Sequence, residues 1–139
     1  MSTMKQDYAI GVSELDEEHQ NLFSLIDDAQ TLLKDENILY KYDNLIKILQ
    51  GLKDYADVHF ETEVSLMESL NYPELKEHVE AHDGFCKQVD SFNLDMDTIS
   101  LGTQDKLIEE LLNYLKSWLQ IHILDCDRKI ALFKTKAAV

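Results

Sequence analysis

Apolar side chains recur every three or four positions through four long stretches of the chain, which is the period of helices that bury one face. The clearest stretch is the last, with Leu107, Ile108, Leu111, Leu112, Leu115, Trp118, Leu119 and Ile123. The predicted helices cover residues 13–35, 40–68, 73–92 and 104–133, between an N-terminal arm at 1–12 and a tail at 134–139. The pattern therefore predicts an all-α protein.

Few residues interrupt these helices. Pro73 is the only proline, and it stands at the start of the third predicted helix, where its missing N–H does no harm. Ser13, with Asp16 three positions later, resembles a capping box at the start of the first helix. Gly51 lies inside the second helix at a cost of ~1 kcal/mol relative to alanine. Long stretches of the chain are therefore free to be helical.

The predicted connections are short, near residues 36–41, 69–72 and 93–103. Short connections between helices of ~20 residues make successive helices antiparallel, which predicts an up-down-up-down four-helix bundle. A chain of 139 residues is too short to build two separate cores, so residues 1–139 are expected to form one domain.

Composition narrows the functions that the chain can serve. Its 27 acidic and 13 basic residues give a net charge of −14, so we expect neither nucleic acid nor an anionic membrane as partner. No apolar run approaches the ~20 residues of a membrane span, and residues 1–8 lack the layout of a secretion signal, so a cytoplasmic protein is expected. Cys86 and Cys126 are too few for a disulfide scaffold and are interpreted as small buried packing residues.

All five histidines fall on the apolar faces of the predicted helices: His19, His59, His78, His82 and His122. His78 and His82 are four positions apart and share one face, and Glu63 follows His59 by the same spacing. One such histidine would be interpreted as a hydrogen-bonded core residue. Burying five of them on four helices with an acid in register is costly unless they are paired or bind a metal, so the pattern favours a metal centre.

The ligand types limit which metal chemistry is possible. In the segment His78-Val79-Glu80-Ala81-His82 the acid is in the wrong position for a zinc protease. The chain has no Cys-x-x-Cys pair for a thiolate zinc site, and it lacks the paired Glu-x-x-His motifs of ferritin-like carboxylate centres. Imidazoles with few carboxylates suit iron, copper, nickel or zinc, and ligand type alone leaves these four open.

Four segments together resemble one known family. They are Gly11-Val12 before Asp16-x-x-His19-x-x-Leu22-Phe23, then His59-Phe60-x-x-Glu63-x-x-x-Met67, then Tyr72-Pro73 before His78-x-x-x-His82-x-x-Phe85, and Trp118-Leu119-x-x-His122-Ile123-x-x-x-Asp127. In this order and with these gaps, the chain resembles the hemerythrins, specifically the single-domain bacterial ones, over nearly its whole length. The resemblance implies a four-helix bundle with a di-iron site in its core.

The resemblance also implies a set of ligands for two non-haem iron ions. His78, His82 and His122 would bind one iron, and His19 and His59 the other. Glu63 and Asp127 would bridge the two irons together with an oxide or hydroxide, which leaves the second iron one ligand short for dioxygen. The expected walls of the dioxygen pocket are Leu22, Phe60, Phe85, Trp118, Leu119 and Ile123.

Asp127 is the least obvious of these ligands. Five residues beyond His122 is ~140° around an ideal α-helix, whereas Asp125, three residues on, would lie nearer the same face. Keeping Asp127 as the ligand predicts a widened turn or a distortion of the helix there.

Reversible dioxygen binding, for storage, delivery, scavenging or sensing, is the function that the resemblance implies, and no catalytic residue is expected outside the ligands. One alternative is a di-iron oxidase or peroxidase that reduces dioxygen or peroxide with electrons from a partner protein. Others are iron handling or the repair of iron centres, and a metal-free bundle for protein interactions.

Overall fold

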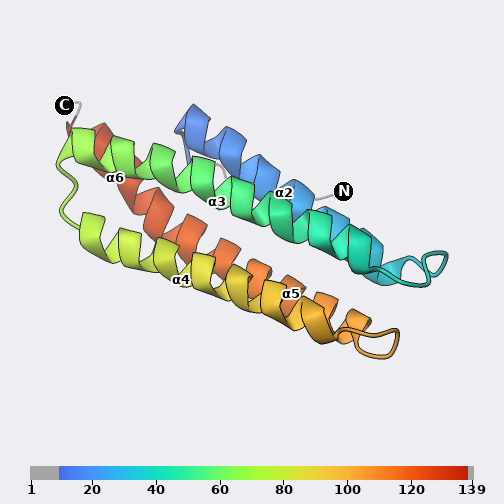
Figure 1. The fold of residues 1–139 in the computed structure, drawn as a ribbon. Coiled ribbons are helices and arrows are strands. Elements are labelled where there is room, and N and C mark those ends of the chain that lie inside the picture. The colour runs from blue at the N-terminus through green and yellow to red at the C-terminus, as the bar shows by residue number, and fades with distance from the viewer. Residues whose placement is uncertain (1–9, 138–139) are drawn as a thin grey trace.

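The computed structural model describes residues 10–137, and no β-strand occurs within that range. The helices are α2 (Ser13–Lys34), α3 (Tyr42–Leu70), α4 (Leu75–Asp95), the 3₁₀ turn η1 (Met96–Thr98), α5 (Gln104–Trp118), the π-helical segment η2 (Leu119–Asp127) and α6 (Arg128–Ala137). The last three follow one another end to end and act as one long helix (Figure 1).

Four antiparallel helical rods make up the bundle (Figure 1). The α2–α3 and α4–α5 connections lie at one end, and the α3–α4 connection lies at the other, near the C-terminal helix. The predicted four-helix bundle is confirmed. None of its helices, over the residues described, combines the length and the apolar character that a bilayer span requires.

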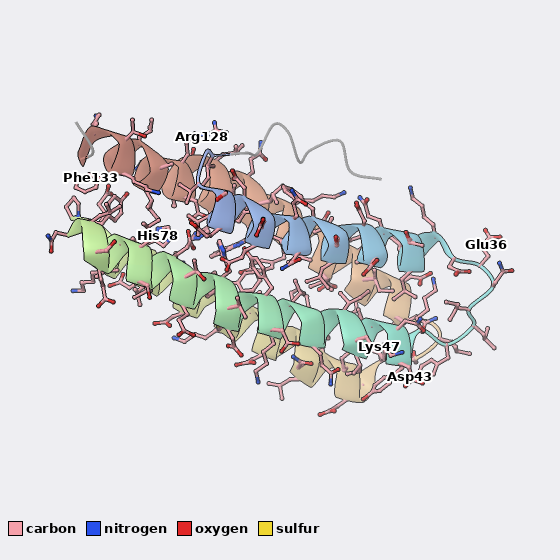
Figure 2. The ribbon with its side chains drawn as sticks, turned by 90° about the horizontal axis from the view of Figure 1, so that it is seen from above. Glu36, Asp43, Lys47, His78, Arg128 and Phe133 are labelled. Carbon is pink, nitrogen blue, oxygen red and sulfur yellow. The ribbon has the colours of Figure 1, made fainter. Side chains whose placement is uncertain are left out.

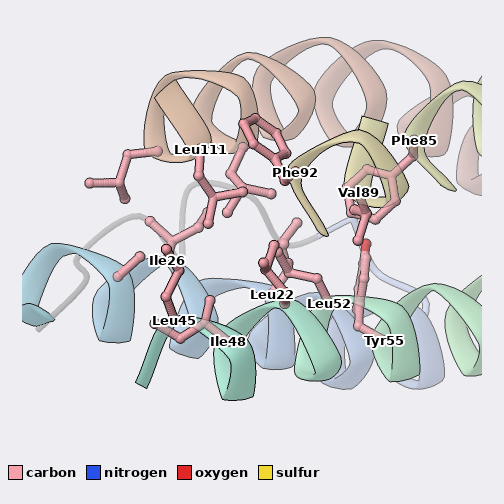
Figure 3. Packing of buried hydrophobic residues seen from close by; sticks show 14 of the residues in the cluster. Leu22, Ile26, Leu45, Ile48, Leu52, Tyr55, Phe85, Val89, Phe92 and Leu111 are labelled. Atoms are coloured by element: carbon pink, nitrogen blue, oxygen red, sulfur yellow. The ribbon is translucent and has the colours of Figure 1, made fainter. Parts of the chain in front are cut away.

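The core follows the apolar faces predicted from the sequence. Figure 3 shows side chains from α2, α3, α4 and α5 meeting between the helices, among them Leu22, Ile26, Leu45, Ile48, Leu52, Tyr55, Phe85, Val89, Phe92 and Leu111. Each fully buried leucine, isoleucine or phenylalanine contributes about 1.5–3 kcal/mol relative to the exposed side chain. Gly51 has a packing role, because a Cβ built there would lie 2.6 Å from Leu25 Cδ2. The missing side chain lets α2 approach α3.

Helix α2 begins at Ser13, as predicted, but the predicted capping box is wrong, because Val12 precedes the first helical residue and no side chain caps α2. The Asp16 carboxylate instead accepts hydrogen bonds from the backbone N–H groups of Ile10 (2.8 Å) and Gly11 (3.1 Å), which lie before the helix. In a capping box this carboxylate would have accepted from the Ser13 backbone N–H. Here it fixes the chain that enters the helix.

The third predicted helix starts two residues later than expected, at Leu75, because Pro73 belongs to a turn. Asn71 ends α3 in the left-handed conformation with φ 52°, and its N–H is donated back to the carbonyls of the last turn. This turn reverses the chain between α3 and α4. The α4 helix ends at Asp95, three residues beyond the prediction.

The predicted C-terminal tail is also wrong, because helix α6 continues to Ala137. Residues 138–139 of that tail, and residues 1–9 of the predicted N-terminal arm, lie outside the described range. The two cysteines differ from expectation as well: Cys86 is exposed and Cys126 is half-buried, so neither is a fully buried packing residue.

A polar cluster closes the end of the bundle where α2 meets α3. Gln104 accepts a hydrogen bond from the Lys41 backbone N–H (2.9 Å) and donates one to the Leu39 carbonyl (2.8 Å). The Lys41 ammonium donates to the Leu33 carbonyl (3.1 Å) and to Asp105 (2.9 Å). This end of the bundle is therefore joined by hydrogen bonds between the α2–α3 connection and the start of α5.

Candidate metal centre

The seven predicted metal ligands meet in the interior, toward the other end of the bundle. His19 comes from α2, His59 and Glu63 from α3, His78 and His82 from α4, and His122 and Asp127 from η2. Every one is buried, and none has more than 5% of its surface exposed. Figure 2 shows His78 between the helices at the end that carries Phe133, far from Glu36 in the opposite connection.

Their ligand atoms form two overlapping groups, each contained within 4.8 Å. One group holds Glu63, His78, His82 and His122, and the other holds His19, His59, Glu63 and Asp127. The first group has three imidazoles and the second has two. Each group has the size of a site for one metal ion, and Glu63 belongs to both.

Asp127 reaches both groups with different oxygens. Its Oδ1 lies 3.0 Å from His122 Nε2 and 3.1 Å from His78 Nε2, while its Oδ2 lies 2.9 Å from His19 Nε2. Glu63 behaves differently, because only Oε1 faces imidazoles: it lies 3.0 Å from His82 Nε2 and 3.2 Å from His59 Nε2. The two carboxylates therefore occupy the space between the two groups of imidazoles.

Several of these buried polar atoms have no hydrogen bond of acceptable geometry. They are Glu63 Oε2, His78 Nε2 and Asp127 Oδ1, with His19 Nδ1 and His122 Nδ1 on the outer sides of their rings. Leaving such atoms unpaired costs about 1–3 kcal/mol each. A metal ion would satisfy His78 Nε2 and Asp127 Oδ1, which face the other ligands, and imidazole with carboxylate is a donor set that suits iron. The residues present thus fit a metal centre.

Without a metal, the carboxylates change the pKa values of the imidazoles. Burial lowers the pKa of His78, but the close contacts of its imidazole with the Asp127 and Glu63 carboxylates outweigh it and raise that pKa to about 9. Burial also lowers the pKa of His59, but the charges of Tyr55 and Glu63 prevail and raise it well above the usual value. For His122 the charge of Asp127 has the same effect. His82 is the exception, because there burial prevails and the pKa is lowered. Metal binding must therefore displace protons from the site.

The predicted distortion of the last helix is confirmed. Residues Leu119–Asp127 form a π-helix, whose hydrogen bonds span five residues instead of four. This wider turn brings Asp127 to the same side as His122, and Asp127 is fully buried. Asp125, which an ideal α-helix would place nearer that face, is exposed.

Five of the predicted pocket residues belong to the buried core cluster, and the sixth, Trp118, is partly buried and packs against it; the five are Leu22, Phe60, Phe85, Leu119 and Ile123. Phe60 stacks on His82 with ring centroids 3.7 Å apart, and Trp118 stacks on His122 at 4.1 Å. Phe85 packs against Trp118 at 4.7 Å. Aromatic rings therefore cover the first group of imidazoles on the side of the bundle core.

Two functional neighbours of His59 were not predicted from the sequence. Glu18 accepts a hydrogen bond from His59 Nδ1 (2.8 Å), and its other oxygen accepts one from the Thr62 hydroxyl (2.8 Å). A carboxylate on the outer nitrogen fixes the orientation of a metal-binding imidazole and makes it more basic. Glu18 and His59 are 41 positions apart, so only the packing of α2 on α3 reveals the pair.

Tyr55 is the other unpredicted neighbour. Its ring stacks on His59 at 5.0 Å and its hydroxyl is buried without a hydrogen-bond partner. Burial is the main reason that the pKa of Tyr55 is raised. The sequence placed Tyr55 only as one apolar member of the helix face.

Two surface grooves reach the centre from outside. A groove of about 360 Å³ between α2 and α3 extends past Glu18 and Leu25 to Tyr55 and His59. A groove of about 480 Å³ between α3 and α4 reaches Phe60 and His82. The second groove also contains Cys86.

Fold and site together define a class of protein: a four-helix bundle with a buried centre of five histidines and two carboxylates. Residues 10–131 match the family model described as the hemerythrin HHE cation binding domain. The chain belongs to the hemerythrin family, which confirms the resemblance seen in its sequence.

Individual relatives agree with this assignment. The chain is 37% identical over 132 residues to a bacteriohemerythrin of Clostridium acetobutylicum, a match that covers 93% of this chain and 98% of the relative. It is 30% identical over 107 residues to hemerythrin subunit 2 of Golfingia vulgaris, covering 77% of this chain and 80% of that one. A hemerythrin-like protein of Naegleria gruberi is 28% identical over 122 residues, covering 88% and 84%. The likeness to the Clostridium protein supports a bacterial hemerythrin.

Proposed function

We propose that this chain holds two iron ions and binds dioxygen reversibly at one of them. The observation that carries the proposal is the asymmetry of the ligands, with three imidazoles in one group and two in the other and with carboxylates between them. His78, His82 and His122 would hold one iron, His19 and His59 the other, and Glu63 and Asp127 would be shared. When bound, a ferrous pair supplies two electrons and an open coordination position for dioxygen.

The protein around the ligands has two tasks. Glu18 and Thr62 hold His59 in one orientation, so that the imidazole stays directed at the position with fewer ligands. The apolar walls exclude water, which would otherwise displace a weakly held small molecule. Leu119 and Ile123 are almost fully buried on the helix that carries His122, which supports such a role as walls.

The test begins with anaerobic loading of the purified chain with ferrous iron. We expect two irons per chain after gel filtration, a colour that appears with dioxygen, and its loss when the sample is evacuated. Fewer than two irons would refute the di-iron site. Sustained consumption of an added reductant under air would instead favour an oxidase or peroxidase, and loss of iron to a mild chelator would favour iron handling.

A cavity variant tests the walls. Leu119→Ala should admit water and make the oxygenated protein convert to the ferric form faster, with a loss of about 2–5 kcal/mol in the free energy of unfolding. Leu132→Ala on α6 is the matched control, because Leu132 is 58% exposed. An oxygenated lifetime that is unchanged in Leu119→Ala would contradict the role of this side chain.

A further inference from the structure

One hydroxyl group is buried within the aromatic part of the predicted pocket. Tyr55 is only 4% exposed, and its hydroxyl makes no hydrogen bond of acceptable geometry. The ring packs edge-on against both Phe60 and Phe85, with centroid distances of 6.1 and 6.0 Å. Buried hydroxyls normally have a partner, so this one calls for an explanation.

Trp118 cannot complete the bonding of this hydroxyl. Its indole N–H lies close enough to act on the Tyr55 oxygen and is itself without a well-formed hydrogen bond. An indole nitrogen only donates, so the proton of the tyrosine hydroxyl would still lack an acceptor. A phenol keeps that proton at neutral pH. Tyr55 therefore offers a free donor inside an apolar enclosure.

The position of the donor relates it to one of the two metal groups. Tyr55 precedes His59 by one helical turn, and the two rings stack at 5.0 Å with an angle of 17° between their planes. Side by side, both rings project from α3 toward the middle of the bundle, and Figure 3 shows the Tyr55 oxygen directed across to α4 near Phe85 and Val89. His59 belongs to the group with only two imidazoles. The tyrosine that carries the free donor therefore packs against the group with only two imidazoles, which has room for another ligand.

We propose that the Tyr55 hydroxyl is the hydrogen-bond donor of this pocket and binds the outer atom of a small oxygen- or nitrogen-terminated ligand at the His19–His59 position. This inference rests on the proposed function, since that ligand needs a metal there. The expected pocket of apolar walls then contains one polar contact, which selects ligands whose outer atom accepts a hydrogen bond.

Azide is a suitable probe, because it is a small anion with a nitrogen at each end. In the ferric, iron-loaded protein, Tyr55→Phe should weaken azide binding about tenfold, the effect of removing one hydrogen bond of about 1.4 kcal/mol. The infrared stretching band of bound azide should shift between wild type and variant. Tyr114→Phe is the control, because Tyr114 is also a tyrosine in contact with Phe85 but lies outside the imidazole cluster, and it should change neither quantity.

A second measurement uses the metal-free protein. If the hydroxyl proton has no acceptor in the protein, Tyr55→Phe should unfold close to the wild-type temperature, since only the imperfect contact with the Trp118 N–H is lost. A clearly lower unfolding temperature would show a partner in the core and overturn the inference. The inference would also be overturned if a Tyr55→Phe protein that keeps its iron showed unchanged azide affinity and an unchanged infrared band. Loss of iron from the variant would overturn it as well. A wild-type chain that holds no iron would instead refute the proposed function itself.

Discussion

Replacing Asp127 by asparagine removes one negative charge and keeps the shape of the side chain. The carboxylate is fully buried, and both oxygens lie close to imidazole nitrogens. Oδ1 is 3.1 and 3.0 Å from those of His78 and His122, and Oδ2 is 2.9 Å from that of His19. An amide offers a single acceptor oxygen, and its NH₂ group would face an imidazole nitrogen or a metal ion. Asp127→Asn should therefore lose one of the two proposed metal contacts.

The size of this effect follows from the position of the residue. Changing a group that only touches a metal ligand typically lowers metal affinity by about 10–100-fold. Asp127 lies between both groups of imidazoles and carries one of the two buried negative charges there, so its loss should exceed that range. We expect ferrous affinity to fall by more than about 100-fold, or about 2.8 kcal/mol.

Anaerobic titration with ferrous iron against a competing chelator measures this directly, and iron content after gel filtration provides a second reading. Asp125→Asn is the matched control, because Asp125 is an exposed aspartate in the same π-helical segment. The control should bind iron as the wild type does. Equal affinity in the two variants, or loss of iron in Asp125→Asn alone, would refute the assignment of Asp127 and the role given to the π-helix.

Three further predictions concern stability. Gln104→Ala should lower the free energy of unfolding in urea by about 2 kcal/mol, because it leaves the buried Lys41 N–H unpaired and removes the bond to the partly buried Leu39 carbonyl. Gln120→Ala on the exposed surface should change it by less than about 0.5 kcal/mol. Asn71→Ala should cost about 1 kcal/mol at its left-handed φ of 52°, and Asn71→Gly should not, as thermal melts would show. Burial raises the pKa of Tyr114 from 10.0 to about 12, so the neutral phenol stabilises the fold below about pH 10, and that contribution is lost as the pH rises toward 12. Tyr114→Phe should therefore make the melting temperature fall less steeply between about pH 10 and about pH 12.

The helices and their buried faces could be predicted because both follow from local spacing. Apolar residues three and four positions apart determine a helix and its inner side, and His59 with Glu63 shares that side by the same rule. Errors came at the helix ends, where short-range hydrogen bonds decide. The Asp16 carboxylate could accept from the Ser13 backbone N–H, as in a capping box, or from the N–H groups of Ile10 and Gly11, and the spacing of the residues is compatible with both.

Contacts between distant segments could not be predicted in this way. The pairing of Glu18 with His59 depends on the rotation of α2 against α3, which no periodic pattern determines. Ideal α-helical geometry would place Asp125, not Asp127, near His122. Asp127 was predicted as the ligand only because the family resemblance required it, and the π-helix now accounts for its position.

The unlike ends of the bundle have a consequence for the metal-free chain. At the end closed by Lys41, Gln104 and Asp105, the helices are joined by hydrogen bonds that need no metal. At the opposite end lie the buried histidines and acids, several of them without a hydrogen-bond partner. The metal-free chain should therefore be more stable at the end closed by Gln104 than around the ligands. Hydrogen exchange in the metal-free form should then be slowest near the α2–α3 and α4–α5 connections and fastest around α6 and the start of α4.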